Sequence, residues 1–348
     1  MKFRIINGSA VLLILVGTLF TFYSCFSLAA SVQPLGNASA DNASVSQVVT
    51  VAEQRELLLA EYSQNEALPL AQRAAATVNL GLYYGPNSVI AVARASRSEH
   101  PQMRLAAIQA AEQWQGKAKW DVVSPMLDDV DLEVEAQAVR TLIELWPQLS
   151  GEYLDRLEPA VDRHLALLPN DLDGDMERAW IYTIKGDFEQ AELIYLNLFD
   201  HHKEPRVAIA YAEYLKSIND DKQAQRILKQ ALVEYPQEAS LHHSLGLSYL
   251  RTKERLNALR RLRNAYELDR NNGSYGYAYA TLVRDSNAET AIKVYQDIYQ
   301  DHAQPAYLYA LCDTLLIAGE NATKCLAELD SVAPQDVVSN LKKLYLSN

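Results

Sequence analysis

Three aspartates at alternate positions are the first group in the sequence whose spacing is typical of ligand binding. Asp171, Asp173 and Asp175 have the spacing with which a calcium-binding loop begins. Such a loop also needs a glycine at its sixth position and a glutamate at its twelfth, where this chain has Met176 and Tyr182. Because both requirements fail, we predict a turn whose aspartate caps the following helix, and no calcium site.

The histidines form no metal-binding motif either. The chain has 7 histidines, including the adjacent pairs His201–His202 and His242–His243. Neighbouring side chains on a helix point about 100° apart, so neither pair can hold one metal ion by itself. We therefore expect no metal site.

The sequence lacks the spacing patterns that identify catalytic and cofactor sites. It contains no His-Glu-x-x-His, Gly-x-Ser-x-Gly, P-loop or dinucleotide-binding pattern. Lys and Arg number 32 against 44 Asp and Glu, and the resulting net charge of −12 argues against binding to nucleic acid. We predict a protein that is not an enzyme and has no cofactor, although a catalytic site assembled from distant residues would leave no such pattern.

The elements that position these side chains are organised by a pattern that recurs after 34 residues. The first copy consists of Ala212, Leu215, Ala224, Leu228, Ala231 and Pro236. The second copy consists of Gly246, Tyr249, Ala258, Leu262, Ala265 and Arg270. Each copy predicts two antiparallel helices, because small residues at facing positions allow two helix axes to approach closely.

This pattern resembles the tetratricopeptide repeat in its period, its small residues and its closing proline. Ala191, Ala224, Ala258 and Ala291 follow one another at intervals of 33, 34 and 33 residues, and Tyr279 and Leu282 belong to the fourth copy. One hairpin cannot bury its apolar face, so neighbouring hairpins must stack. We predict an all-α, helical-hairpin solenoid in which about five tetratricopeptide-like repeats end in a C-terminal capping helix.

A different repeat, with a period of 31 residues, precedes the first. Its three copies contain Arg73, Ala76, Thr77 and Leu80, then Arg104, Ala107, Ile108 and Ala111, then Glu135, Ala138, Val139 and Leu142. These Ala-rich amphipathic helices resemble HEAT repeats over residues 66–160. Pro, Gly and Asp in the stretch 168–175 indicate a boundary. We therefore expect HEAT-like repeats over residues 51–168 and tetratricopeptide-like repeats over residues 169–348.

Residues 1–30 have the composition of a targeting segment. Lys2 and Arg4 precede an apolar run, and small residues follow it up to Ala30. We favour removal as a signal peptide, while retention of residues 5–26 as a membrane anchor and lipidation at Cys25 are the alternatives. Residues 31–50 predict a flexible spacer. The expected location is the periplasm, with inner-membrane anchorage as the alternative, and we expect membrane contact only through the N-terminal segment.

The order of the two kinds of repeat resembles the C-terminal portion of bacterial multihaem c-type cytochromes. Residues 259–268 and the tyrosines near 277–281 resemble the penultimate repeat of that family. The Cys-x-x-Cys-His motifs of the family are missing, so the resemblance does not imply haem binding. It implies an exported bacterial scaffold or, alternatively, an accessory subunit that docks a haem protein in an extracytoplasmic redox or cytochrome-assembly system.

We predict that the first helices of the tetratricopeptide-like repeats form a concave groove that binds a protein or peptide, in the membrane or in a periplasmic complex. The positions equivalent to groove residues of the family are Trp180, Thr183, Ile209, Glu213, Lys216, His243 and Leu247. This mixture of apolar, polar and charged side chains suits an extended peptide, whose apolar and polar groups would contact matching side chains. The alternative is that these residues line a surface with no ligand.

A run of cations lies in the second central repeat. It consists of Arg251, Lys253, Arg255, Arg260, Arg261 and Arg263. Glu254 and Glu267 lie close by in the sequence. We favour a solvated helix face with local ion pairs over a site for an anion or a membrane surface.

Two of the three cysteines fall at the small-residue positions of the fifth repeat. Cys312 and Cys325 would therefore lie on facing helices, near bonding distance. In an oxidising compartment a disulfide between them would form and persist. We expect this bond, and the alternative is a pair of reduced cysteines that act as small apolar fillers.

Overall fold

The computed structural model describes residues 51–333 and 335–346, and every regular element in these ranges is a helix. The predicted targeting segment 1–30, the spacer 31–50 and Cys25 lie outside the described residues. Within the described ranges, no helix has both the length and the apolar character that crossing a membrane requires.

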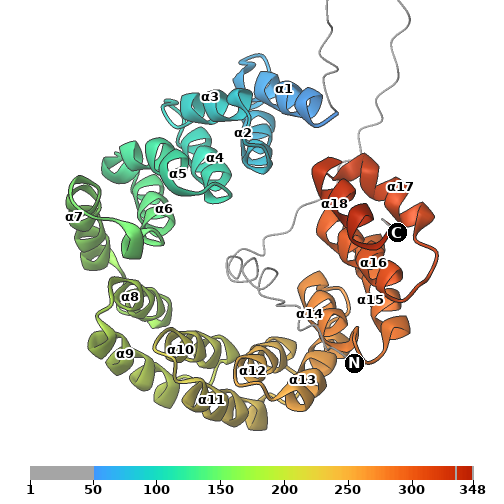
Figure 1. The fold of residues 1–348 in the computed structure, drawn as a ribbon. Coiled ribbons are helices and arrows are strands. Elements are labelled where there is room, and N and C mark those ends of the chain that lie inside the picture. Colours follow the sequence, from blue (N-terminus) through green and yellow to red (C-terminus); the bar gives the residue numbers. More distant parts are fainter. Residues whose placement is uncertain (1–50, 334, 347–348) are drawn as a thin grey trace, which may run out of the picture. The chain divides into compact units, whose positions relative to one another are not determined.

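The N-terminal part of the described chain consists of seven α-helices and three short 3-10 helices (Figure 1). They are α1 (Val51–Gln64), α2 (Leu70–Asn79), η1 (Leu80–Leu82), α3 (Pro86–Ala95), α4 (Pro101–Glu112), α5 (Gly116–Val123), η2 (Ser124–Asp128), α6 (Leu132–Ile143), η3 (Trp146–Gln148) and α7 (Glu152–Leu167). The Ala-rich sequences of the 31-residue repeat are α2, α4 and α6, and α4 packs against both of the others. Their equivalent residues Ala76, Ala107 and Ala138 are buried, which explains the small residue at this position.

The C-terminal part is a series of helical hairpins followed by a final helix (Figure 1). The helices are α8 (Leu172–Lys185), α9 (Phe188–His201), α10 (Pro205–Ser217), α11 (Asp221–Glu234), α12 (Ala239–Arg251), α13 (Arg255–Leu268), α14 (Gly273–Val283), α15 (Ala288–His302), α16 (Pro305–Ile317), α17 (Thr323–Val332) and α18 (Gln335–Leu346). Each even-numbered helix from α8 to α16 packs against the next helix in the chain, and α18 contacts α16 and α17. The predicted all-α, helical-hairpin repeat architecture is confirmed.

Close contact between paired helices accounts for the small residues of the 34-residue repeat. Ala212, Ala224 and Ala258 are buried in the hairpins α10–α11 and α12–α13. At Gly246 even a methyl group is too large, because an added Cβ would lie 2.7 Å from Leu262 Cδ2. The second central hairpin therefore depends on glycine at this position.

The fourth hairpin differs from the predicted register by one residue. Helix α14 has 11 residues where α12 has 13, and the link from its end to the N-cap Asn287 has three residues where the link from α12 to Glu254 has two. The fully buried small residue of α14 is Ala280, one position after Tyr279 and 34 after Gly246, so it lies 11 positions before Ala291, whereas Gly246 lies 12 before Ala258. Tyr279 is half-buried, and its ring stacks on that of Tyr266 at 6.0 Å.

The apolar core continues from one kind of repeat into the other. Ile181 of α8 belongs to the core of the N-terminal part, whereas Ala179 of the same helix belongs to the next core cluster. Leu259 and Tyr279 in turn pack against both this cluster and the last one. The predicted boundary at residues 168–175 therefore contains the link between α7 and α8, but the described helices belong to one compact unit.

Candidate functional site: the first-helix surface

The seven residues predicted to form the groove lie on three neighbouring first helices. Trp180 and Thr183 are on α8, Ile209, Glu213 and Lys216 on α10, and His243 and Leu247 on α12. Helix α10 contacts both α8 and α12, so equivalent positions of consecutive repeats lie on adjacent helices. We call the outward side chains at these positions the first-helix surface.

The apolar members of this surface are half-buried. Trp180 packs against the core of the N-terminal part, and Ile209 and Leu247 pack against the next core cluster. Each side chain therefore keeps some exposed apolar area and is held in place from behind. Fixed apolar side chains of this kind lose little conformational entropy when a ligand covers them.

The polar members already have partners within α8 and α10. Thr183 Oγ1 donates to the carbonyl oxygen of Ala179 at 2.8 Å, which keeps the hydroxyl close to its own helix. The Lys216 ammonium pairs with the Glu213 carboxylate one turn away. Both charged groups are partly exposed, so a charged group of a ligand can replace either member of the pair.

His243 is buried, unlike the other members of the surface. Its ring lies 4.8 Å from the ring of Tyr275 on α14. Removal from water lowers the pKa of His243 to about 4, so the imidazole is neutral near pH 7. Its neighbour His242 is hydrogen-bonded to the Pro236 carbonyl oxygen, and burial lowers the pKa of His242 as well.

Three residues that the sequence analysis did not assign extend the surface onto the next two first helices. Tyr277 and Arg284 occupy the equivalent positions on α14 when its register is counted from Ala280, and Asp313 does so on α16 when the register is counted from Cys312. Arg284 Nη1 donates to Asp313 Oδ2 at 2.8 Å. The 34-residue period counted from His243 and Lys216 identifies Tyr277 and Arg284, whereas counting back from Ala291 places the register of α14 one residue too early.

The three aspartates of the calcium-like spacing are all engaged within the protein. Asp171 Oδ1 accepts a hydrogen bond from the Gly174 amide at 2.9 Å and so caps α8. Asp173 pairs with Arg206 and Asp175 with Arg178. Over residues 51–333 and 335–346, no three His, Cys, Asp or Glu side chains lie close enough together to hold a metal ion.

The most strongly shifted carboxylate lies where α6, α7 and α8 meet. Glu177 Oε1 accepts from Arg140 Nε at 2.6 Å and lies 2.6 Å from His164 Nε2. Burial alone would raise the pKa of Glu177, but the hydrogen bonds from His164 and Arg140 outweigh it and lower the pKa to about 2. We interpret this cluster as an ion-pair network that joins three helices.

Two surface pockets lie away from the first-helix surface. One, of about 280 Å³, is lined by Arg55, Leu58, Leu59, Asn79, Leu82 and Tyr83. The other lies between α9, α10 and α11, and its lining includes Phe199, Ala208 and Tyr235. Neither of these pockets contains a residue of the predicted groove.

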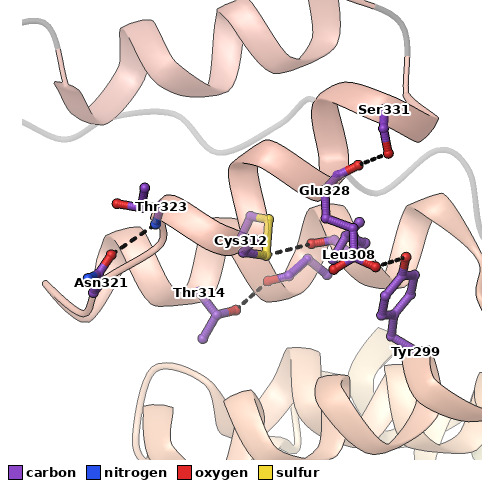
Figure 2. The surroundings of a disulfide bond; sticks show 10 residues. Tyr299, Leu308, Cys312, Thr314, Asn321, Thr323, Glu328 and Ser331 are labelled. Carbon is purple, nitrogen blue, oxygen red and sulfur yellow. Dashed lines mark hydrogen bonds between the residues drawn. A yellow bond between two sulfur atoms is a disulfide. The ribbon is translucent and has the colours of Figure 1, made fainter.

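The two cysteines of the last hairpin are joined by a disulfide between α16 and α17 (Figure 2). Their Cα atoms are 5.5 Å apart, and both side chains are buried. Helix α17 is also held to α15, since Tyr299 Oη donates to Glu328 Oε1 at 2.8 Å. These contacts fix the last hairpin to the preceding helix.

Comparisons with known proteins give only distant structural neighbours. No protein-family model and no curated protein matches the sequence. Among solved structures, MamA is 17% identical over 49% of this chain and 93% of its own, with a TM-score of 0.40. YrrB, described as a TPR protein with an unusual peptide-binding site, is 15% identical over 53% of this chain and 97% of its own, with a TM-score of 0.41. Pseudomonas aeruginosa PilF is 18% identical over 61% of this chain and 99% of its own, with a TM-score of 0.43.

Proposed function

We propose that this protein is an exported, non-enzymatic helical-repeat scaffold that binds a protein or peptide partner on its first-helix surface. The observation that carries the proposal is the row of different, half-buried side chains at equivalent positions of adjacent first helices. A row of this kind offers apolar contacts at Trp180, Ile209 and Leu247 beside the charged pair on α10.

An extended segment is the ligand that this arrangement suits best. Apolar side chains of the ligand would cover Ile209 and Leu247, which lie on adjacent helices, while its charged groups meet Lys216 or Glu213. Large aromatic side chains contribute most to such interfaces, so Trp180 is the residue expected to dominate affinity. The neutral imidazole of His243 contributes a hydrogen-bonding group without a charge.

Export and the absence of catalysis are supported by the sequence. Residues 1–30 have the charge and apolar pattern of a signal peptide or membrane anchor, which favours a periplasmic location. The perturbed side chains near the proposed surface are tyrosines and histidines whose pKa shifts come from burial, and none forms a pair of nucleophile and base.

Affinity capture with surface variants tests this function. Wild-type protein, Trp180→Ala and Lys216→Glu are used to capture partners from membrane and periplasmic extracts, with Lys117→Glu on the exposed face of α5 as the matched control. Binding segments of the captured proteins are then titrated as synthetic peptides. We expect both surface variants to weaken binding by about tenfold or more, and the control to behave as wild type.

The proposal fails if wild type and both surface variants retain the same partners with the same affinity. Capture of folded c-type cytochromes, without an extended binding segment, would support the docking subunit that the sequence suggested as the alternative.

A further inference from the structure

The second helices of the two central hairpins carry a row of exposed side chains that the first-helix surface does not use. On α11 these are Lys222, Arg226, Lys229 and Val233, and on α13 they are Leu256, Arg260, Arg263 and Glu267. Within each helix the four residues are spaced by four, three and four, which keeps them on one face. The 34-residue period places the two sets at equivalent positions, and we call them together the outer row.

The outer row has a local positive charge on a chain of net charge −12. It contains five cations and one carboxylate, and that carboxylate, Glu267, pairs with Arg263 at 2.8 Å. Arg226 and Arg260 have no ion-pair partner among the described residues. The Lys229 ammonium lies 5.3 Å from the centre of the Tyr249 ring, an arrangement that leaves its charge available to solvent.

The outer row shares Arg260 and Arg263 with the cation run of the sequence, whereas three other members of the run have local partners. Arg251 pairs with Asp221 at 2.7 Å, Arg255 with Asp285 at 3.0 Å, and Arg261 Nη1 lies 3.2 Å from His242 Nδ1. Local pairing therefore accounts for much of the run, as expected of a solvated face. The unpaired positive charges are those of Arg226 and Arg260, which occupy equivalent positions on α11 and α13.

Two aliphatic side chains at the ends of the row are almost fully exposed. Val233, the last member of the row on α11, is 81% exposed, and Leu256, the first member on α13, is 80% exposed. No neighbouring element covers them. Cations interspersed with exposed aliphatic side chains are typical of surfaces that lie against a lipid bilayer, where the cations meet phosphates and the aliphatic groups enter the headgroup region.

We propose that the outer row binds the surface of an anionic lipid bilayer. Charge complementarity supports an anionic partner, and the high exposure of the side chains suits the spread-out charge of a membrane better than a single phosphate in a cleft. The apolar stretch at residues 5–26 directs the chain to a membrane in any case. The proposal departs from the expectation that membrane contact involves only the N-terminal segment, and it is independent of the first-helix surface.

Vesicle flotation of the full-length chain tests the proposal. The vesicles are phosphatidylcholine alone or phosphatidylcholine with about one third phosphatidylglycerol. The two variants of the outer row are Arg226→Glu/Arg260→Glu and Arg226→Lys/Arg260→Lys. The matched control is Arg94→Glu/Arg97→Glu, on the exposed surface near α3. Comparison of the variants on the same vesicles removes the contribution of residues 1–30, which is the same in every variant. Circular dichroism confirms that each variant is folded.

Wild type, the lysine variant and the control should bind anionic vesicles more tightly than neutral ones, and added salt should weaken that difference. The glutamate variant should lose at least about tenfold in binding to anionic vesicles, because each cation near such a surface contributes about fivefold. The proposal is overturned if the glutamate variant keeps wild-type binding to anionic vesicles or if the control loses as much. It is also overturned if wild type binds soluble polyglutamate more tightly than anionic vesicles at equal charge concentration, since the surface would then recognise acidic polypeptide.

Discussion

At the scale of single residues, His243 shows how a neighbouring repeat changes the chemistry of a surface position. Its imidazole is 8% exposed, because the ring of Tyr275 from the next hairpin covers it. Protonation would bury a charge without a counterion, which is the reason its pKa falls to about 4. A histidine in the unfolded chain has a pKa of about 6.5, so the two states differ in proton binding between these values.

This difference predicts a loss of stability in weak acid. The unfolded chain binds a proton at His243 below about pH 6.5, whereas the folded chain does not until about pH 4. The free energy of unfolding should therefore fall by about 2 kcal/mol between pH 7.5 and pH 5 through this residue. Urea titrations of wild type and His243→Leu at pH 7.5 and pH 5 measure the free energy of unfolding. Between these pH values the variant should lose less stability than wild type.

The exposed His201→Leu exchange is the control, and its stability should change with pH as that of wild type does. If His243→Leu shows the same loss between pH 7.5 and pH 5 as wild type, burial of a neutral imidazole is not the cause.

Residue positions were predictable from the sequence wherever the repeat period held. The period placed Trp180, Ile209 and Leu247 on consecutive first helices, where the structure has them. It gave no information on the burial of His243, since the covering ring belongs to the following hairpin. Arg284 and Asp313 were missed because their ion pair joins two first helices, α14 and α16, and the register of α14 was counted back from Ala291.

At the scale of the elements, the last hairpin is held by a covalent bond, which no other hairpin in the described ranges has. The disulfide closes a loop with a sequence separation of 13 between α16 and α17. A terminal hairpin has a packing neighbour on one side only, apart from the capping helix α18. Its stability therefore depends more on internal constraints than that of a central hairpin.

Removal of the bridge should destabilise the protein by about 2–3 kcal/mol, because the unfolded chain regains the entropy that the closed loop removes. Cys312→Ala/Cys325→Ala is compared with wild type by urea unfolding, with and without reductant. Reductant should lower the stability of wild type to that of the variant and leave the variant unchanged. Peptide mapping of exported protein without reduction should recover the two cysteines in one linked fragment, whereas two freely alkylated thiols would show that the bond is absent.

Several element boundaries coincide with prolines and capping residues of the sequence. Pro101, Pro205 and Pro305 each begin a helix, and Asp171 caps α8. The register of α14 was wrong by one residue in the sequence analysis. Tyr279 and Ala280 are neighbours that each suit a packed position, and the choice between them depends on the number of residues from that position to Ala291, which is one fewer than in the central hairpins.

At the scale of the whole molecule, α8 connects the two kinds of repeat through side chains that face different cores. Ile181 is 0% exposed in the first core, and Glu177 of the same helix receives Arg140 from α6. A boundary that is clear in the sequence is therefore bridged by apolar and ionic contacts. We expect the described helices to unfold cooperatively, in spite of their repeat organisation.

Ile181→Ala tests this cooperation. All four tryptophans lie between residues 114 and 180, so their fluorescence reports on the N-terminal part and α8, while circular dichroism reports on every helix. The two unfolding curves of wild type should coincide. In Ile181→Ala they should separate, with the fluorescence transition destabilised by about 2–4 kcal/mol. Val130→Ala, at a site that is 96% exposed, should leave both curves unchanged. Coincident curves in Ile181→Ala would contradict the proposed bridging role.

The disulfide of the last hairpin also affects how the chain passes through a narrow pore. A translocase or a processive protease that pulls on the C-terminus meets α18 and α17 first and then reaches Cys325, whose bond to Cys312 keeps the intervening loop closed. Two strands must then enter the pore side by side, or a reductant must act first. A channel that admits a single strand would therefore pass only the reduced chain, and a protease with such a pore would stop at Cys325 of the oxidised protein.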